Sequence, residues 1–226
     1  MSNNNHVRVP ASRQIPGIMS ELETAAETLE HIGWAVSVFG SARVKPESPW
    51  YGQAEALGRK LADAGFTLIA GGGPGLMEAA NKGAFQAGGK SVGLNIRLPR
   101  ESSNNPYQTH SLSFEYFYSR KATFFMHSAA YVALPGGYGT LDELFEVLTL
   151  VQTGKVPPAP IVLIGTEFWQ GLLHWMHEQL LANGLIGQND PGLMLVTDSL
   201  DDAVAHIARF CTEHPEERDT APALPE

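Results

Sequence analysis

The sequence has 226 residues, 43% hydrophobic content and one cysteine, Cys211, which fits a single domain with an ordinary core and no internal disulfide. Its net charge of −9 argues against a general nucleic-acid binder, which needs a basic surface to displace counterions from phosphates. Because residues 1–10 lack the apolar segment of a signal peptide and no apolar run reaches the ~20 residues that cross a bilayer, we expect a cytoplasmic protein without a membrane partner.

Short apolar strands alternate with longer amphipathic helices along the chain. In order, we expect a helix at 18–31, a strand at 34–39, a helix at 49–64, a strand at 66–70, a helix that runs to about 87, a strand at 91–96, a helix at 114–127, a strand at 129–134, a helix at 139–152, a strand at 161–164, a helix at 168–181, a strand at 193–197 and a helix at 200–211. Such alternation is typical of a parallel sheet between helices. The predicted fold class is therefore α/β: a Rossmann-like, doubly wound, mainly parallel sheet with helices on both faces, in one domain at 18–212.

Three segments have no regular pattern. Residues 1–17 are predicted to form a flexible N-terminal extension and residues 213–226 a disordered C-terminal tail, because both are polar and contain proline. Residues 97–109 have no apolar period and contain two prolines. They are long for a connection inside a compact domain, so we expect them to cover a binding site.

Two of the predicted turns from strand to helix are rich in glycine, at 71–75 (GGGPG) and 136–140 (GGYGT). Glycine lets the backbone approach a ligand closely, and the start of the next helix presents unpaired N–H groups and the positive end of its dipole. Ligands in such sheets bind beyond the carboxyl ends of the strands. We therefore expect the two turns to hold one ligand; the alternative is that the glycines serve tight turns only.

The spacing of these glycines narrows the ligand class. Neither turn ends in Gly-Lys-Ser/Thr, so neither is a Walker A loop, and residues 71–76 do not fit Gly-x-Gly-x-x-Gly. Asn95 stands at the end of the third strand, where a dinucleotide-binding protein has a ribose-binding carboxylate. A mononucleotide or a sugar phosphate fits this pattern better than a redox dinucleotide.

Thr140 and Glu143 follow the second glycine turn at the expected start of a helix. Their spacing also matches a capping box, in which both side chains only satisfy backbone N–H groups. In the functional interpretation, Glu143 lies beside the ribose of a bound nucleotide, where it stabilises positive charge at C1′ or activates a water molecule. Asp142 is one position earlier and is expected to point elsewhere.

Arg120 and Lys121 lie on the helix before the fourth predicted strand. They are either a solvated basic pair or site residues, with the Arg120 guanidinium holding phosphate or ribose oxygens. Glu78 is either a dipole partner at the start of its helix or a site carboxylate. The eight histidines show no convincing metal-ligand spacing, so we expect no metal site.

Residues 135–143 read PGGYGTLDE, which has the form PGGxGTxxE, and residues 71–84 read GGGPGLMEAANKGA. Together with Ser119, Arg120 and Lys121, these motifs resemble the LOG (LONELY GUY) family, and most of all a bacterial branch with a longer N-terminal extension. The resemblance covers roughly residues 36–197. Some members have been labelled lysine decarboxylase, but pyridoxal phosphate chemistry needs a Schiff-base lysine in a suitable setting, and Lys121 has no visible context of that kind.

Members of the LOG family are cytokinin riboside 5′-monophosphate phosphoribohydrolases, and many also cleave AMP. The resemblance implies that this chain hydrolyses such a nucleotide to the free base and ribose 5-phosphate, without a cofactor and as a homo-oligomer. The base preference is left open. The apolar stretch 114–125 is predicted to support a subunit interface. The alternative function is that of a non-catalytic carrier of a nucleotide or of the molybdenum cofactor, which relatives of this fold carry.

The resemblance also assigns site residues. It implies that Arg120 and Glu143 are the catalytic pair. The substrate-binding residues that we expect are Gly40, Ser41, Gly72, Gly73, Gly75, Glu78, Lys121, Pro135, Gly136, Gly137, Gly139 and Thr140.

Overall fold

The computed structural model describes residues 10–98 and 104–215. Its strands are β1 (Ala35–Phe39), β2 (Thr67–Ala70), β3 (Ser91–Ile96), β4 (His110–Phe114), β5 (Ala130–Ala133), β6 (Ile161–Ile164) and β7 (Met194–Thr197). They form one seven-stranded sheet in the order β4-β3-β2-β1-β5-β6-β7, and every neighbouring pair is parallel. The predicted doubly wound α/β fold is confirmed.

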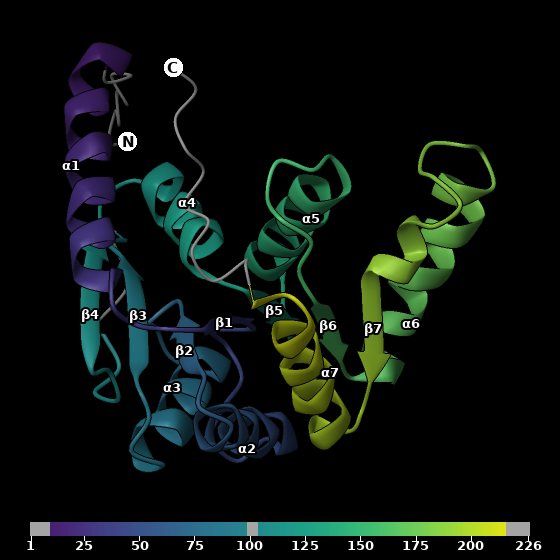
Figure 1. Cartoon of the computed structure of the whole chain (residues 1–226), viewed down its shortest axis with the longest axis horizontal. Coiled ribbons are helices and arrows are strands. Elements are labelled where there is room, and N and C mark those ends of the chain that lie inside the picture. The colour runs from purple at the N-terminus through teal and green to yellow at the C-terminus, as the bar shows by residue number, and fades with distance from the viewer. Residues whose placement is uncertain (1–9, 99–103, 216–226) are drawn as a thin grey trace, which may run out of the picture.

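Helices cover both faces of this sheet (Figure 1). They are α1 (Ala11–Leu29), α2 (Pro49–Asp63), α3 (Leu76–Gln86), α4 (Phe117–His127), α5 (Tyr138–Gln152), α6 (Thr166–Trp175) and α7 (Leu200–Glu213). Helices α2, α3 and α7 pack on the face that Val36 and Val38 present. The other face, which carries Ala35 and Phe39, is covered by α1, α4, α5 and α6. None of the helices in the described part of the chain is long and apolar enough to span a membrane.

The sheet changes direction at β1, the central strand. The chain leaves β1 toward β2 on one side and later returns to β5 on the other, which makes the carboxyl ends of β1 and β5 the topological switch point where ligands bind in such folds. Backbone hydrogen bonds connect the turns there: the Ser41 N–H donates to the Pro135 carbonyl (3.1 Å), and the Leu76 N–H donates to the Ser41 carbonyl (3.0 Å). The turns after β1, β2 and β5 therefore meet at one corner of the sheet.

Strand β4 and the start of α4 correct the prediction. The sequence predicted no strand at 110–114, and it placed the start of the helix at 114 instead of Phe117. Strand β4 reads HSLSF and pairs only with β3 at the edge of the sheet. Of its residues, only Leu112 and Phe114 are buried, so its apolar signal is too weak to identify a strand.

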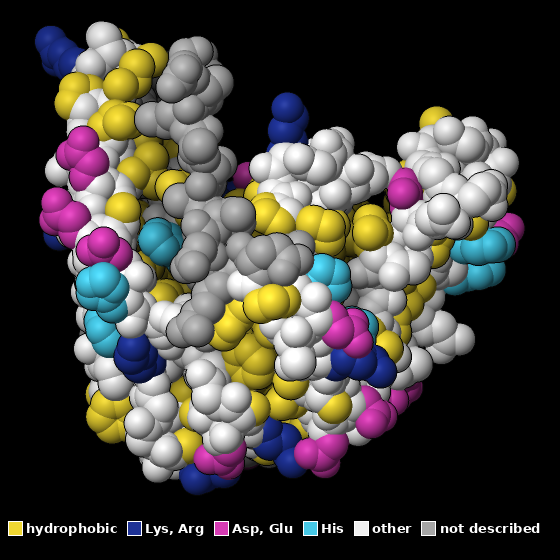
Figure 2. Space-filling model, viewed as in Figure 1, with side chains coloured by type: hydrophobic (Ala, Val, Ile, Leu, Met, Phe, Trp, Pro, Cys, Tyr) yellow, Lys and Arg dark blue, Asp and Glu magenta, His cyan; other side chains and the backbone are white. Residues whose placement is uncertain are grey.

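Helix α1 begins at Ala11, so residues 11–17, which were predicted to be flexible, are helical even though Pro16 lies among them. Contacts with distant residues hold the helix in place. The Glu21 carboxylate accepts hydrogen bonds from the Glu115 backbone N–H (2.7 Å) and from the Ser119 hydroxyl, while hydrophobic side chains remain at the surface along α1 (Figure 2). Near the C-terminus, Glu213 was predicted to belong to the disordered tail, but it is the last residue of α7. The predictions for residues 1–9 and 216–226 lie outside the described residues.

Helices α2 and α3 approach each other closely at two glycines that the sequence did not single out. A Cβ atom on Gly83 would collide with the Glu55 carbonyl of α2, and one on Gly58 would collide with the Ala80 carbonyl of α3. The backbones of the two helices are therefore in contact. This contact fixes α3, whose first turn follows the glycine run at 71–75.

We predict that Gly83→Ala lowers the free energy of unfolding by about 1–3 kcal/mol, because overpacking outweighs the gain in helix propensity. Urea unfolding measures this change. Gly52→Ala is the matched control, since Gly52 lies in α2 with open space around a Cβ atom, and it should be neutral or stabilising by up to about 1 kcal/mol. Equal stabilisation by both changes would contradict the close helix contact.

Candidate active site

The second glycine-rich turn leads directly into α5. Gly137 is the N-cap residue and no side chain caps this helix. Residues 137–139 are exposed, and a Cβ atom on Gly137 or Gly139 would meet nothing within 4 Å. The N–H groups of the first helical turn are thus not capped by a side chain, and together with the positive end of the helix dipole they form an arrangement that binds anions.

Thr140 and Glu143 do not form the capping box that their spacing allows. Because α5 starts at Tyr138, Thr140 is the third helical residue and Glu143 lies in the second turn, not the first as predicted. Thr140 is buried, and its side chain fills the space where a Cβ atom on Gly136 would lie. Glu143 is therefore not used as a cap. Pro135, also buried, completes the turn with its carbonyl bonded to Ser41.

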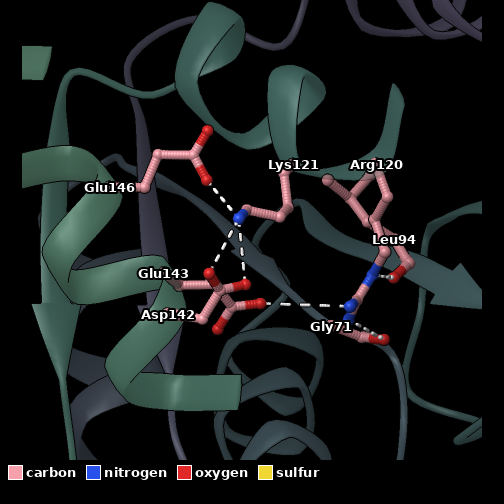
Figure 3. Close-up of polar contacts among 7 residues, drawn as sticks. All are labelled: Gly71, Leu94, Arg120, Lys121, Asp142, Glu143 and Glu146. Atoms are coloured by element: carbon pink, nitrogen blue, oxygen red, sulfur yellow. Dashed lines mark hydrogen bonds and ion pairs between the residues drawn. The ribbon is translucent and has the colours of Figure 1, made fainter. Parts of the chain in front are cut away.

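Arg120 extends from α4 into the sheet corner and is buried (Figure 3). Its Nε donates to the Leu94 carbonyl (2.7 Å) and its Nη2 to the Gly71 carbonyl (3.2 Å). Nη1 lies 3.9 Å from Oε1 of Glu143, and the guanidinium carbon stands 5.4 Å from the centre of the Phe124 ring. The planar fork of arginine thus connects β3, the first glycine turn and α5, so it is not a solvated surface cation.

The Glu143 side chain is only 14% exposed. Burial, which disfavours the charged form, raises the pKa of its carboxyl to about 7, and Asp142 and Glu146 act in the same direction. The charges of Arg120 and Lys121 offset part of this rise. A buried carboxyl that titrates near neutral pH beside a guanidinium is typical of groups that handle protons or developing charge.

Lys121 lies next to this pair, but its ammonium contacts two carboxylates. Nζ is 2.9 Å from Oδ2 of Asp142 and also contacts Glu146 (Figure 3). Burial lowers the pKa of Lys121, but the hydrogen bonds to Glu146 and Asp142 outweigh this and raise it. In the structure Lys121 joins α4 to α5, and its predicted contact with substrate stays a prediction.

The first glycine-rich turn lies on the other side of Arg120. Gly75 has a positive φ of +71°, which L-residues with side chains rarely adopt, and a Cβ atom there would collide with the Ser41 carbonyl. A Cβ atom on Gly71 would collide with Nη2 of Arg120. Gly40 is also closely packed, because its Cβ would lie 2.9 Å from the Leu76 side chain.

Glu78 is half-buried in the first turn of α3, where its carboxylate accepts a hydrogen bond from the Tyr51 hydroxyl (2.9 Å). This contact joins α3 to α2. The structure therefore explains Glu78 as part of the helix packing, and its predicted contact with substrate remains a prediction.

The structure thus brings Arg120 and Glu143 together with both glycine-rich turns. Sequence reasoning missed Asn105 and Gln108, whose side chains bind the carbonyls of the first turn; the only signal was the unusual length of the connection at 97–109. Among the described residues, no group of three or more His, Cys, Asp and Glu side chains is arranged to hold a metal ion.

Solved structures share this fold. The molybdenum cofactor carrier protein from Chlamydomonas reinhardtii aligns with a TM-score of 0.59 at 23% identity, over 80% of this chain and 99% of that one. The molybdenum cofactor binding protein from Rippkaea orientalis aligns with a TM-score of 0.56 at 20% identity, over 79% of this chain and 97% of that one. At these identities the similarity concerns the fold alone.

Sequence relatives are more informative. The profile of a family described as "Possible lysine decarboxylase" matches residues 77–207. A cytokinin riboside 5′-monophosphate phosphoribohydrolase from Mycobacterium marinum is 32% identical over 77% of this chain and 94% of its own length. Another, from Rhodococcoides fascians, is 32% identical over 70% of this chain and 81% of its own, and LOG1 from Arabidopsis thaliana is 29% identical over 70% and 75%. With its glycine turns, its buried Arg120–Glu143 pair and these relatives, the chain belongs to the LOG family.

Proposed function

We propose that this protein is a cytoplasmic hydrolase that cleaves the N-glycosidic bond of AMP or of a cytokinin riboside 5′-monophosphate, releasing the free base and ribose 5-phosphate. The observation that carries the proposal is the ion pair of Arg120 with Glu143, buried between two glycine-rich turns. The names of the bacterial relatives support the same class of reaction.

The substrate phosphate would bind at the uncapped start of α5, where N–H groups and the helix dipole favour an anion. This contact is remote from the bond that breaks, so it supplies binding energy that holds the ribose in place. The phosphate-binding residues are then Gly136, Gly137, Gly139 and Thr140, and Glu143 comes one turn further along the helix. The ribose of a bound nucleotide would extend from the turn toward that carboxyl.

Cleavage of a glycosidic bond passes through a state with positive charge on the sugar. The ionised Glu143 carboxylate stabilises this charge at C1′ or orients the attacking water. Arg120 holds Glu143 in position and favours its ionised form, opposing the effect of burial. Because Arg120 is fixed by two backbone carbonyls, the pair is organised before substrate arrives, as electrostatic catalysis requires.

A carrier of a nucleotide or of the molybdenum cofactor is the alternative function. Carriers share the fold, but a carrier gains nothing from a buried carboxyl beside its ligand, since burying that group costs free energy. Incubation with AMP separates the two functions: a hydrolase releases adenine and ribose 5-phosphate, whereas a carrier returns the nucleotide unchanged.

The family description also names a decarboxylase. A lysine that forms a Schiff base reacts as the neutral amine. Lys121, beside the catalytic pair, is instead held as an ammonium by Asp142 and Glu146. The contacts of Lys121 therefore favour hydrolysis at this site over amino-acid decarboxylation.

The protein is also proposed to be a homo-oligomer. Large apolar side chains are exposed on the neighbouring helices α1 and α4, namely Ile15, Met19, Phe117, Tyr118 and Met126. Within the predicted interface stretch 114–125, however, Phe114, Phe124 and Phe125 are buried in the core. Within that stretch, Phe117 and Tyr118 on α4 are the large apolar residues left exposed for a subunit contact, next to Ile15 and Met19 of α1.

Replacing Glu143 by Gln should lower the turnover of AMP by about 10²–10³-fold, because the amide cannot carry the charge that stabilises the transition state. Chromatography of released adenine measures the effect, with circular dichroism as a test of folding. Glu167→Gln is the matched control, since Glu167 is exposed on α6. Activity of the folded Glu143→Gln variant within a few-fold of wild type would rule out this mechanism.

The pH dependence of kcat/KM should follow the ionisation of Glu143. Since the carboxylate is the active form and its pKa is raised to about 7, the rate should rise with pH and level off above this value. The residual activity of Glu143→Gln provides the control. Its pH profile keeps any titration of the substrate phosphate but lacks the titration of the Glu143 carboxyl. Identical profiles for the two proteins would contradict the assignment.

Light scattering with size-exclusion chromatography tests the homo-oligomer. We expect a mass of at least twice the 24.4 kDa of the chain, and a shift toward the monomer in Tyr118→Glu, because a charge in an apolar contact is costly. The exposed substitution Glu167→Gln should leave the mass unchanged. A monomeric wild-type protein at micromolar concentration would refute the proposal.

A further inference from the structure

Side chains from elsewhere in the fold hold all three carbonyls of residues 71–73. Arg120 donates to the Gly71 carbonyl (3.2 Å). The Gly72 carbonyl accepts from Nδ2 of Asn105 (3.0 Å), from the Asn105 backbone N–H (2.9 Å) and from Nε2 of Gln108 (3.1 Å). Nδ2 of Asn105 also reaches the Gly73 carbonyl (3.2 Å). Such a concentration of donors on one short turn fixes the orientation of its peptide planes.

Asn105 is itself anchored to the sheet. Its side chain is buried, and Nδ2 also lies 3.0 Å from Oδ1 of Asn81. Asn81 in turn donates to the Ser91 hydroxyl (2.8 Å) and to the Val92 carbonyl (3.1 Å) at the start of β3. Oδ1 of Asn105 accepts from the Tyr107 N–H (3.1 Å). The amide therefore has a fixed orientation, with its donors toward the glycine turn.

Gln108 is fixed in the same way by Asn95 on β3. Their amides exchange hydrogen bonds of 3.0 and 3.2 Å, and Nδ2 of Asn95 also lies within hydrogen-bonding distance of the Leu112 carbonyl (3.0 Å) on β4. The described part of the connection after β3 thus attaches the first glycine turn to two strands.

The direction of these carbonyls decides where the N–H groups of the turn point. In a trans peptide the C=O of one residue and the N–H of the next point in opposite directions, and the described residues contain no cis peptide bond. Holding the Gly71 and Gly72 carbonyls therefore fixes the directions of the Gly72 and Gly73 N–H groups, each opposite to the carbonyl that is held. Successive N–H groups of a turn with fixed directions offer a site for an anionic or hydroxyl oxygen.

We propose that Asn105 and Gln108 are positioning residues of the nucleotide site, which hold the first glycine turn so that its N–H groups can bind oxygen atoms of the ribose 5-phosphate part of the ligand. This inference rests on the proposed function, because it assigns the first turn to the same ligand as α5. Arg120, which binds the same turn and approaches Glu143, connects this binding role to the catalytic pair.

Asn105→Asp tests the proposal. Aspartate has the same shape and keeps the acceptor for the Tyr107 N–H, but it places an oxygen opposite the Gly72 and Gly73 carbonyls. The KM for AMP should rise about 10–100-fold, as expected for losing hydrogen bonds to buried groups, while kcat changes less than KM. Asn104→Asp is the matched control, because the neighbouring Asn104 is exposed and its side-chain amide donates to the Ser111 hydroxyl on β4 (3.3 Å).

A change in the KM for AMP distinguishes a positioning role from a simple loss of stability. A variant that is only less stable contains less active enzyme, so its apparent kcat falls while its KM stays the same. Gln108→Glu is the second variant, since Gln108 is only half-buried and its loss disturbs the core less. A folded variant of either kind that keeps the wild-type KM for AMP and the wild-type affinity for ribose 5-phosphate would overturn the proposal.

Calorimetric titration with ribose 5-phosphate distinguishes failure of this inference from failure of the proposed function. If wild type releases no base from AMP but binds ribose 5-phosphate more tightly than Asn105→Asp does, the hydrolase function fails and the positioning role holds. If wild type cleaves AMP and the variants bind ribose 5-phosphate equally well, only the positioning role fails. If wild type neither cleaves AMP nor binds ribose 5-phosphate, both fail.

Discussion

The burial of the Arg120 guanidinium is the interaction on which the site depends. Removing this cation from water is costly unless its N–H groups find partners, and the fold supplies carbonyls at the end of β3 and in the first glycine turn together with the carboxylate of Glu143. The partners come from separate parts of the chain, so the cation is satisfied only when β2, β3, α4 and α5 are all in place. The same arrangement that allows the arginine to be buried thus assembles the site.

Glu143 shows how two opposing effects are balanced at one carboxyl. Burial raises its pKa to about 7, and the charge of Arg120 limits the rise. A carboxyl exposed to water would be ionised at neutral pH, but water would weaken the interaction of its charge with any neighbouring group. A carboxyl buried without Arg120 would stay neutral. The Lys121 bridge to Asp142 and Glu146 keeps a second cation nearby and joins α4 to the helix that carries Glu143.

The sequence predicted much of this arrangement, and the predictions that were wrong or missing have physical causes. The buried strands and the two glycine turns have strong local signals, and the motifs identified Arg120 and Glu143. Strand β4 was missed because only two of its residues are buried. The helical residues 11–17 were missed because α1 is held by contacts of Glu21 with residues 94 and 98 positions later in the chain. Thr140 and Glu143 have the spacing of a capping box, but α5 starts at Tyr138, so Thr140 lies inside the helix and is not its N-cap. Asn105 and Gln108 could not be found, since their role depends on partners in β2–α3 and β3 that only the fold brings near.

The two backbone anchors of Arg120 differ in how they tolerate change. At Leu94 the acceptor is a main-chain oxygen, which every amino acid carries, so a substitution there alters the neighbouring packing and leaves the hydrogen bond available. At Gly71 the acceptor is again a main-chain oxygen, but a side chain of any size would occupy the volume of the guanidinium. A substitution at Leu94 therefore leaves the arginine its acceptor, whereas a side chain at residue 71 would push the guanidinium out of its position.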